Sequence, residues 1–233
     1  MEIHRAGDRF VTAGEGRETR HSFSFGSHYD PANLRFGLLV CHNDELVQPG
    51  SGYPDHPHSN LEIVTWVLGG SLRHQDSQGN GGVVEPGRVQ AMSAGAGVVH
   101  AETVDVASGP TRFLQTWLLP DQPGGAASYS SGAVEPGAEW TPLASGSHPD
   151  SAARIGAGAA TLWAARLRAG ESVEVPEVPH AHLFLASGAA GITGSGDAAL
   201  VASDAVRLSG EGARVVATMP TEMLLWTFAT MTP

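Results

Sequence analysis

The chain has 233 residues, enough for one large β domain or for two domains of about 115 residues each. Lys and Arg together number 13 and Asp and Glu 24, so the formal net charge is −11, spread without long runs of one sign. Because no basic patch is present, binding of nucleic acid is not expected.

The first residues, Met1 to Arg5, are not followed by an apolar segment or a cleavage site, and no apolar run reaches the length that crosses a bilayer. We therefore expect a cytoplasmic protein with neither an export signal nor a membrane span. The lone Cys41 excludes an internal disulfide and fits a reducing compartment, where a small buried thiol is its expected state. No heptad pattern is evident, so a monomer is expected.

Short apolar or β-branched runs follow one another along the chain, separated by turn residues. With 30 Gly and 15 Pro in the sequence, these runs predict many short strands, as in a β-sandwich or barrel, rather than long helices. The cluster Asp76 to Gly82 is typical of a long hairpin loop. In chain order, the predicted strands are Phe36–Cys41, Leu61–Leu68, Val83–Val84, Thr111–Leu119, Leu162–Leu167, Val173–Val175, Leu183–Leu185, Val215–Ala217 and Met223–Phe228.

A shift in composition marks the middle of the chain. From Pro120 to about Ala160 the sequence is rich in Gly, Ala, Ser and Pro, which favours a connector. The strand pattern then returns, and the segment Val178 to Gly188 is similar to Asp55 to Gly69, as in a duplicated barrel. We therefore expect an N-terminal barrel over residues 1–125, a connector over 126–160 and a C-terminal barrel over 161–233.

Two motifs, each with two potential metal ligands separated by one residue, indicate a metal site in the first barrel. In a strand, side chains at i and i+2 lie on one face, so His56 and His58 point the same way, as do His100 and Glu102. If the two strands face each other inside a barrel, three imidazoles and one carboxylate converge. Such a ligand set is typical of a first-row transition metal with open coordination positions.

These motifs resemble those of the cupin family. Gly50, His56, His58, Glu62 and Gly69 have the spacings of the first cupin motif. Gly95 to His100 resembles the second, with Gly95 where many cupins carry Pro. The resemblance implies an all-β fold of two tandem jelly-roll-type cupin barrels, a bicupin.

Further segments are similar to the pirins and the bacterial pirin-like quercetinases, over at least residues 20–120. In that family the His-x-His pair and the second motif's His and Glu hold the metal, which implies His56, His58, His100 and Glu102 as ligands of one divalent transition metal per chain. Family members usually carry Ser at the position of Ala101, whose side chain would point away from the metal. The other matching segments are Arg20–Phe25, Tyr29–Pro31, His74–Asn80, Val89–Gly95 and Leu114–Trp117.

A second carboxylate is an alternative to Glu102 as the metal ligand. Many other cupins use the Glu of the first motif, here Glu62, and an unbroken strand would place it on the face of His56 and His58. The family resemblance and the pair geometry favour Glu102, which would leave Glu62 as a supporting group or a structural ion pair.

The second repeat is expected to hold no metal. No His follows His182, and Ala186 stands where a first-motif Glu would fall, so His180 and His182 cannot complete a four-ligand site.

Several other residues are candidates of lower priority. His21, His28, His42 and His74 are expected near turns or strand ends, as surface or hydrogen-bonding groups. Trp66 would share a face with His58 on an unbroken strand and so could line the cavity, but the core is its expected place. Residues expected in the core or in a pocket wall are Phe23, Phe25, Met92, Gln115 and Trp117.

The family resemblance also implies a reaction: opening of a flavonol ring, or of a related 3-hydroxy enolone, with incorporation of O2 and release of carbon monoxide. Glu102 would then be the catalytic residue, accepting the proton of the substrate hydroxyl. Fe(II) is the metal that the resemblance favours, and Mn, Ni, Co, Cu and Zn suit the same ligands. The expected partners are a small aromatic substrate and O2.

Two other classes of function remain open from the sequence. Some pirins are regarded as non-enzymatic regulators, which would make this chain a redox-sensing metal protein that acts through protein partners. A metal-dependent isomerase or a small-molecule binder would share the same barrel, because a fold does not determine one function.

Overall fold

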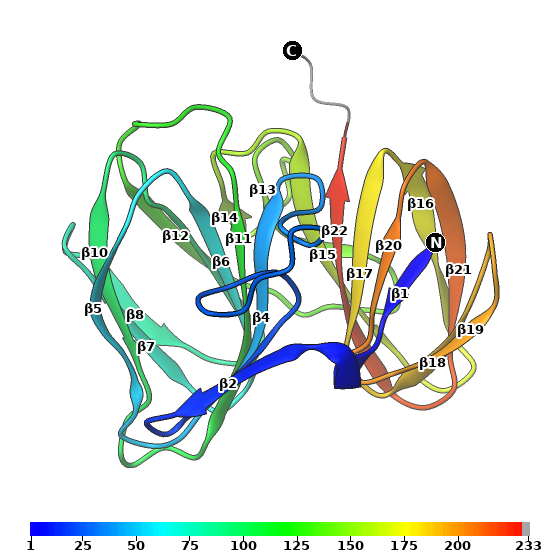
Figure 1. Cartoon of the computed structure of the whole chain (residues 1–233), viewed down its shortest axis with the longest axis horizontal. Helices are drawn as coiled ribbons and strands as arrows, with labels where there is room; N and C mark the ends of the chain where they lie inside the picture. Colours follow the sequence, from blue (N-terminus) through cyan, green and yellow to red (C-terminus); the bar gives the residue numbers. More distant parts are fainter. Residues whose placement is uncertain (230–233) are drawn as a thin grey trace. The chain divides into compact units, whose positions relative to one another are not determined.

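The computed structural model describes residues 1–229, and its regular structure consists of β-strands apart from one 3-10 turn, η1 (Ala6–Asp8) (Figure 1). The predicted all-β class with two barrels is confirmed. None of the described residues forms a helix that is long and apolar enough to cross a membrane.

The described chain forms two compact units. The N-terminal unit comprises Phe10–Val134 and Ala152–Gly158. The C-terminal unit comprises Met1–Arg9, Glu135–Ser151 and the residues from 159 to 229. These bounds differ from the expected division into residues 1–125, 126–160 and 161–233.

Strand pairing explains the difference at the start of the chain. β1 (Glu2–His4) pairs antiparallel with β20 (Ala205–Leu208), with Ile3 opposite Val206. The backbone hydrogen bonds of this pair place the first residues in the C-terminal unit, although they precede the first barrel in sequence.

The expected connector likewise contains paired strands. β12 (Ser128–Ala133) pairs with β9 (Arg88–Ser93), so this part belongs to the N-terminal unit. β13 (Thr141–Ser145) pairs with β15 (Ala160–Leu167) in the C-terminal unit. A composition rich in small residues is therefore compatible with ordered edge strands here.

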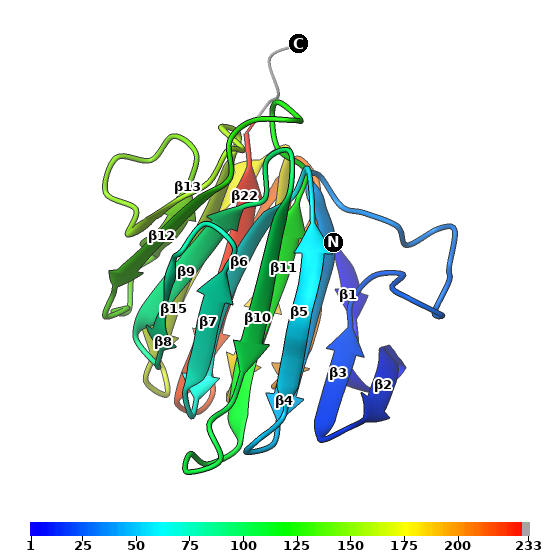
Figure 2. The same cartoon turned by 90° about the vertical axis from the view of Figure 1, so that its left-hand side faces the viewer.

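Two antiparallel sheets build the N-terminal unit. The larger has the strand order β12-β9-β6-β11-β4-β3-β2 and the smaller the order β5-β10-β7-β8. In Figure 2, β10 lies between β5 and β7, as their pairing requires. The bounds not yet given are β2 (Phe10–Gly14), β3 (Arg17–His21), β4 (Leu39–Val47), β5 (Gly52–His58), β6 (Glu62–Gly69), β7 (Leu72–Asp76), β8 (Gly81–Val84), β10 (Val98–Thr103), β11 (Thr111–Leu118) and β14 (Ala153–Arg154).

Apolar side chains from both sheets pack between them at one end of this unit. Val47, Val67 and Phe113 of the larger sheet meet Leu72 and Val84 of the smaller one, and all five are buried. This packing holds the two sheets face to face. A second buried apolar cluster of the unit contains Ile63, Met92, Ala94 and Val98.

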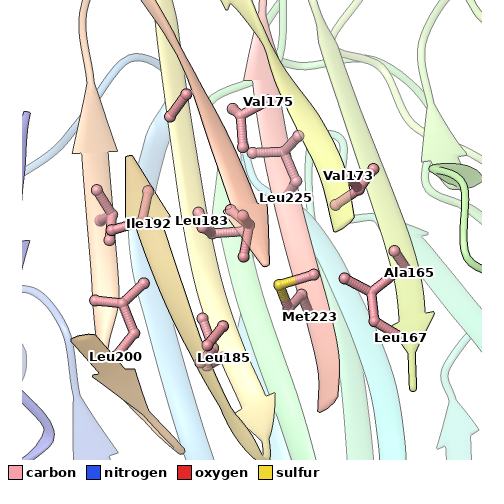
Figure 3. Packing of buried hydrophobic residues seen from close by; sticks show 14 of the residues in the cluster. Ala165, Leu167, Val173, Val175, Leu183, Leu185, Ile192, Leu200, Met223 and Leu225 are labelled. Carbon is pink, nitrogen blue, oxygen red and sulfur yellow. The ribbon is translucent and has the colours of Figure 1, made fainter. Parts of the chain in front are cut away.

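The C-terminal unit repeats the arrangement. In one sheet, the strands that belong to this unit are neighbours in the order β1-β20-β17-β22-β15-β13, and the other sheet has the order β16-β21-β18-β19. Its core is apolar, with Leu183, Met223 and Leu225 among the buried side chains that meet between the strands (Figure 3). The remaining bounds are β16 (Ser172–Val178), β17 (His180–Ser187), β18 (Ala189–Thr193), β19 (Ala198–Val201), β21 (Glu211–Ala217) and β22 (Thr221–Phe228).

The two His-x-His pairs occupy different places in this duplicated topology. His56 and His58 lie on β5, the edge strand of the smaller sheet, whose counterpart is β16. His180 and His182 lie on β17, which has β20 and β22 as neighbours, as β6 has β9 and β11. The similar spacing in the sequence therefore does not mark equivalent positions in the fold.

Candidate metal centre

Three histidines converge where β5 and β10 pair. His100 lies directly opposite His56, and His58 lies opposite Val98. The ring centroid of His100 is 4.4 Å from that of His56 and 5.0 Å from that of His58. One ring nitrogen from each of the three lies within 4.8 Å of the others.

The nitrogens of these rings are free to bind an ion. Within residues 1–229, His58 Nε2 and both ring nitrogens of His100 are buried without a hydrogen-bond partner. His56 Nδ1–H donates to the carbonyl oxygen of Pro54 at 2.7 Å, which leaves its Nε2 as an acceptor. Buried polar atoms without partners are rare and call for an explanation, and a metal ion would supply one.

Burial also keeps two of these imidazoles neutral. It lowers the pKa of His58 to about 4, and the neighbouring His56 acts in the same direction. Burial lowers the pKa of His100 to about 3, with His56, His58 and His74 adding to the effect. Neutral imidazole is the form that ligates divalent transition metals, so the residues present fit such an ion.

Glu102 is the buried carboxylate of the centre, with 1% of its surface exposed. Burial raises the pKa of Glu102 to about 7, against the opposing effect of its hydrogen bonds and with a contribution from the negative charge of Glu45. Its oxygens accept from Gln115 Nε2 at 2.7 Å and from Gln90 Nε2 at 3.1 Å.

The two glutamines are themselves oriented by aromatic donors. Trp117 Nε1–H donates to Gln115 Oε1 at 3.0 Å, and the Tyr129 hydroxyl donates to Gln90 Oε1 at 3.2 Å. Each amide therefore presents its NH2 group to Glu102. This arrangement holds the carboxylate on both oxygens.

His74 joins this centre, although we expected it near a turn or strand end. It is the middle residue of β7, opposite Glu102 on β10, and is 1% exposed. Ligand atoms of His74, His100 and Glu102 lie within 4.8 Å of one another. The structure thus gathers the candidate ligands in two groups that share His100. His74 and Asp76 form an i, i+2 pair on a strand, which is the signal that could have pointed to this position.

Glu62 belongs to neither group. It is buried at the start of β6, where its Oε2 accepts from Ser93 Oγ at 2.5 Å and from the Gly156 N–H at 2.8 Å. The alternative that placed Glu62 on the same face as His56 and His58 assumed one continuous strand. Instead β5 ends at His58, and Asn60 adopts a φ of 54°, which turns the chain before β6.

A cavity of about 620 Å³ opens beside the centre, with His56, His58 and Glu102 in its wall. Trp117 packs edge-on against His58 at 4.8 Å and against Phe25 at 5.2 Å. Of the residues expected in the core or in a wall, Phe25, Gln115 and Trp117 line this cavity, whereas Phe23 and Met92 are buried in the core, as is Trp66.

Two of the remaining histidines are buried, and His21 lies at the end of its strand, as expected. His21 and His42 are 3% and 1% exposed and lie in β3 and β4. His21 lines the cavity, with its Nδ1 3.0 Å from Asn43 Oδ1. His28 stacks on Phe10, with ring centroids 4.9 Å apart.

Comparison with known proteins gives one family match and several full-length relatives. The sequence profile of the family described as Pirin matches residues 4–118. A Mycobacterium tuberculosis protein named "Putative quercetin 2,3-dioxygenase" is 46% identical over 231 residues, covering 97% of this chain and 94% of the relative. A Pseudomonas aeruginosa protein of the same name is 40% identical over 178 residues, covering 75% and 76%.

Solved structures with a similar fold include a protein from the same family. YhhW from Escherichia coli superposes with a TM-score of 0.90 at 25% identity, covering 100% of this chain and 99% of YhhW. Its complex with nickel(II), described as a bacterial pirin, gives a TM-score of 0.89 at 25% identity over 99% of both chains.

Proposed function

The chain belongs to the pirin family, and on this premise we propose that it is a metal-dependent dioxygenase that opens the ring of a flavonol or a related 3-hydroxy enolone. The observation that carries the proposal is the set of three converging histidines beside a cavity with aromatic walls. The reaction would incorporate both atoms of O2 into the product and release carbon monoxide.

We propose His56, His58, His100 and Glu102 as the ligands of one divalent metal per chain. The nickel(II) complex of YhhW supports a site of this kind. Fe(II) is our choice for the native ion, and Mn, Ni, Co, Cu and Zn suit the same donors. When bound, such an ion supplies the chemistry that activates the enol and O2.

The remaining roles fall to residues of the cavity. Phe25 and Trp117 offer aromatic faces against which the rings of a flavonol can pack. Glu102 accepts the proton of the substrate's enol hydroxyl, while Gln90 and Gln115 keep its carboxylate in place.

A cytoplasmic setting suits Cys41, which is 1% exposed and whose pKa is raised by burial.

The test is reconstitution with each metal. The protein is loaded with Fe(II) under anaerobic conditions, O2 and quercetin are added, and loss of the flavonol absorbance is followed. The proposal predicts turnover with Fe(II) and loss of turnover in His58→Ala. Failure to turn over with Fe, Mn, Ni, Co, Cu or Zn would overturn it and favour a regulatory metal protein that acts through protein partners.

A further inference from the structure

A second polar cluster lines the same cavity, and none of its residues belongs to the two groups of candidate ligands described above. It consists of Thr19 on β3, Glu45 on β4 and Tyr53 on β5. Glu45 is 3% exposed, and its Oε2 accepts from Thr19 Oγ1 at 2.5 Å and from the Tyr53 hydroxyl at 2.8 Å.

The two sheets of the N-terminal unit position this cluster together. Thr19 lies directly opposite Glu45 in the β3–β4 pair. Tyr53 comes from the smaller sheet and precedes His56 by three residues, a separation of ~10 Å along a strand. The ring centroids of Tyr53 and His56 are 6.2 Å apart. A ligand with two linked ring systems can therefore lie beside the histidines and reach Glu45.

The carboxylate of Glu45 has no cationic partner among residues 1–229. Arg17 is close, but its guanidinium lies over the Tyr53 ring, 4.7 Å from the centroid. Its nitrogens donate to the Gly52 carbonyl oxygen at 3.0 Å and to Glu15 at 2.5 Å. A buried carboxylate held only by neutral donors lowers the stability of a fold, so its presence in a cavity wall calls for a functional reason.

Glu45 also retains hydrogen-bonding capacity. A carboxylate offers about four acceptor positions. Thr19 and Tyr53 occupy two, and the side chain of Asn43 makes a further hydrogen bond to Glu45. One position remains for a donor that enters the cavity.

Resting on the function proposed above, we propose that Glu45 determines substrate specificity by accepting a hydrogen bond from a phenolic hydroxyl group remote from the substrate's enol. The substrate class is then hydroxylated flavonols and related polyphenolic enolones, in preference to analogues without remote hydroxyl groups. Tyr53 and Thr19 position the carboxylate.

The test compares two ligands that share the enol and its neighbouring carbonyl. Quercetin carries remote phenolic hydroxyl groups, and 3-hydroxyflavone carries none. The dissociation constants of both are measured on the Zn(II)-loaded full chain without O2, so that no turnover is needed. The parent protein is expected to prefer quercetin by about tenfold to a hundredfold, the range for one hydrogen bond to a charged acceptor.

Two variants then address Glu45. Glu45→Leu is expected to abolish the preference, and Glu45→Gln, which keeps the shape and a neutral acceptor, to reduce it several-fold. Glu62→Gln is the matched control, because it also replaces a buried carboxylate held by a hydroxyl donor but lies outside this cavity. Its preference should equal that of the parent. Should Glu45→Leu fail to fold, Glu45→Gln answers the question alone.

The outcomes separate this inference from the proposed function. An unchanged preference in the Glu45 variants, or no preference in the parent, overturns the role of Glu45 even if quercetin is turned over. A preference that falls in the Glu45 variants supports that role, and absence of turnover with every metal would then overturn the dioxygenase reaction alone.

Discussion

His100 faces His56 across the β5–β10 pair, with ring centroids 4.4 Å apart. The two residues are far apart in sequence, and only the antiparallel register brings their side chains together. His58 joins them because it follows His56 by two residues on the same strand. The group of His56, His58 and His100 is thus a product of one strand pair, and its proposed role can be tested one side chain at a time.

Replacing His100 should abolish metal binding, because His100 is the residue common to both groups of candidate ligands. His100→Ala is reconstituted with Fe(II), freed of unbound metal and assayed for metal per chain. We expect content near background, whereas the control His180→Ala should match the parent. Parental metal content in His100→Ala would contradict this assignment.

The two candidate carboxylates should behave differently. Glu102→Ala is expected to lower metal affinity at least tenfold, the effect of losing a carboxylate from the centre. Glu62→Ala should keep its metal and lose ~1–3 kcal/mol of stability, because Ser93 and Gly156 lose their shared acceptor. Metal titration and urea unfolding measure the two effects. Equal metal content in Glu102→Ala and the parent would contradict the assignment of Glu102 as the carboxylate ligand.

Much of this centre could be predicted from the sequence, because the i, i+2 rule is local. It places His56 with His58 without knowledge of the fold. The rule fails across a turn: the positive φ of Asn60 separates Glu62 from the histidines. For His74 the rule indicates only that its side chain shares a face with that of Asp76, because the place of His74 beside Glu102 depends on the pairing of β7 with β10.

The domain boundaries illustrate the same limit at a larger scale. The first strand, β1, pairs with β20 near the other end of the chain, and composition does not reveal a pairing between segments so far apart in sequence. Likewise, the spacing of His180 and His182 imitates that of His56 and His58, yet the pair lies on a strand of different topological position. Spacing identifies a motif, and strand order decides whether two copies are equivalent.

Gln115 should be needed to hold the Glu102 carboxylate. Gln115→Leu removes the 2.7 Å hydrogen bond to Glu102 and the acceptor of the Trp117 indole N–H. We expect turnover to fall about tenfold or more and stability to fall by ~1.5–3 kcal/mol, the range for a hydrogen bond to a charged group. Gln122→Leu, at an exposed position, is the control for both assays. Parental turnover in Gln115→Leu would refute this role.

Glu45 should make stability depend on pH. Burial, the largest cause, raises the pKa of Glu45 in the folded chain. The folded state therefore binds this proton more tightly than the unfolded state. The resulting stabilisation is complete below the unfolded pKa and is lost as pH rises through the folded pKa. Glu45→Gln stays neutral, so its stability relative to the parent should increase as pH rises through this window.

Urea unfolding of Glu45→Gln and the parent at a series of pH values measures this difference. A difference that stays constant with pH would show that Glu45 titrates alike in the folded and unfolded chains, and a change in the opposite direction would show that folding lowers the pKa of Glu45. Either result would contradict the prediction.

The central claim is that the histidine centre of the N-terminal unit supports O2-dependent opening of a flavonol ring. The most direct measurement counts O2 consumed and carbon monoxide released per quercetin lost, for the Fe(II)-loaded parent and for His58→Ala. We predict one O2 consumed and one carbon monoxide released per quercetin in the parent, and neither in the variant. Loss of quercetin without carbon monoxide, or equal release by His58→Ala, would contradict the claim.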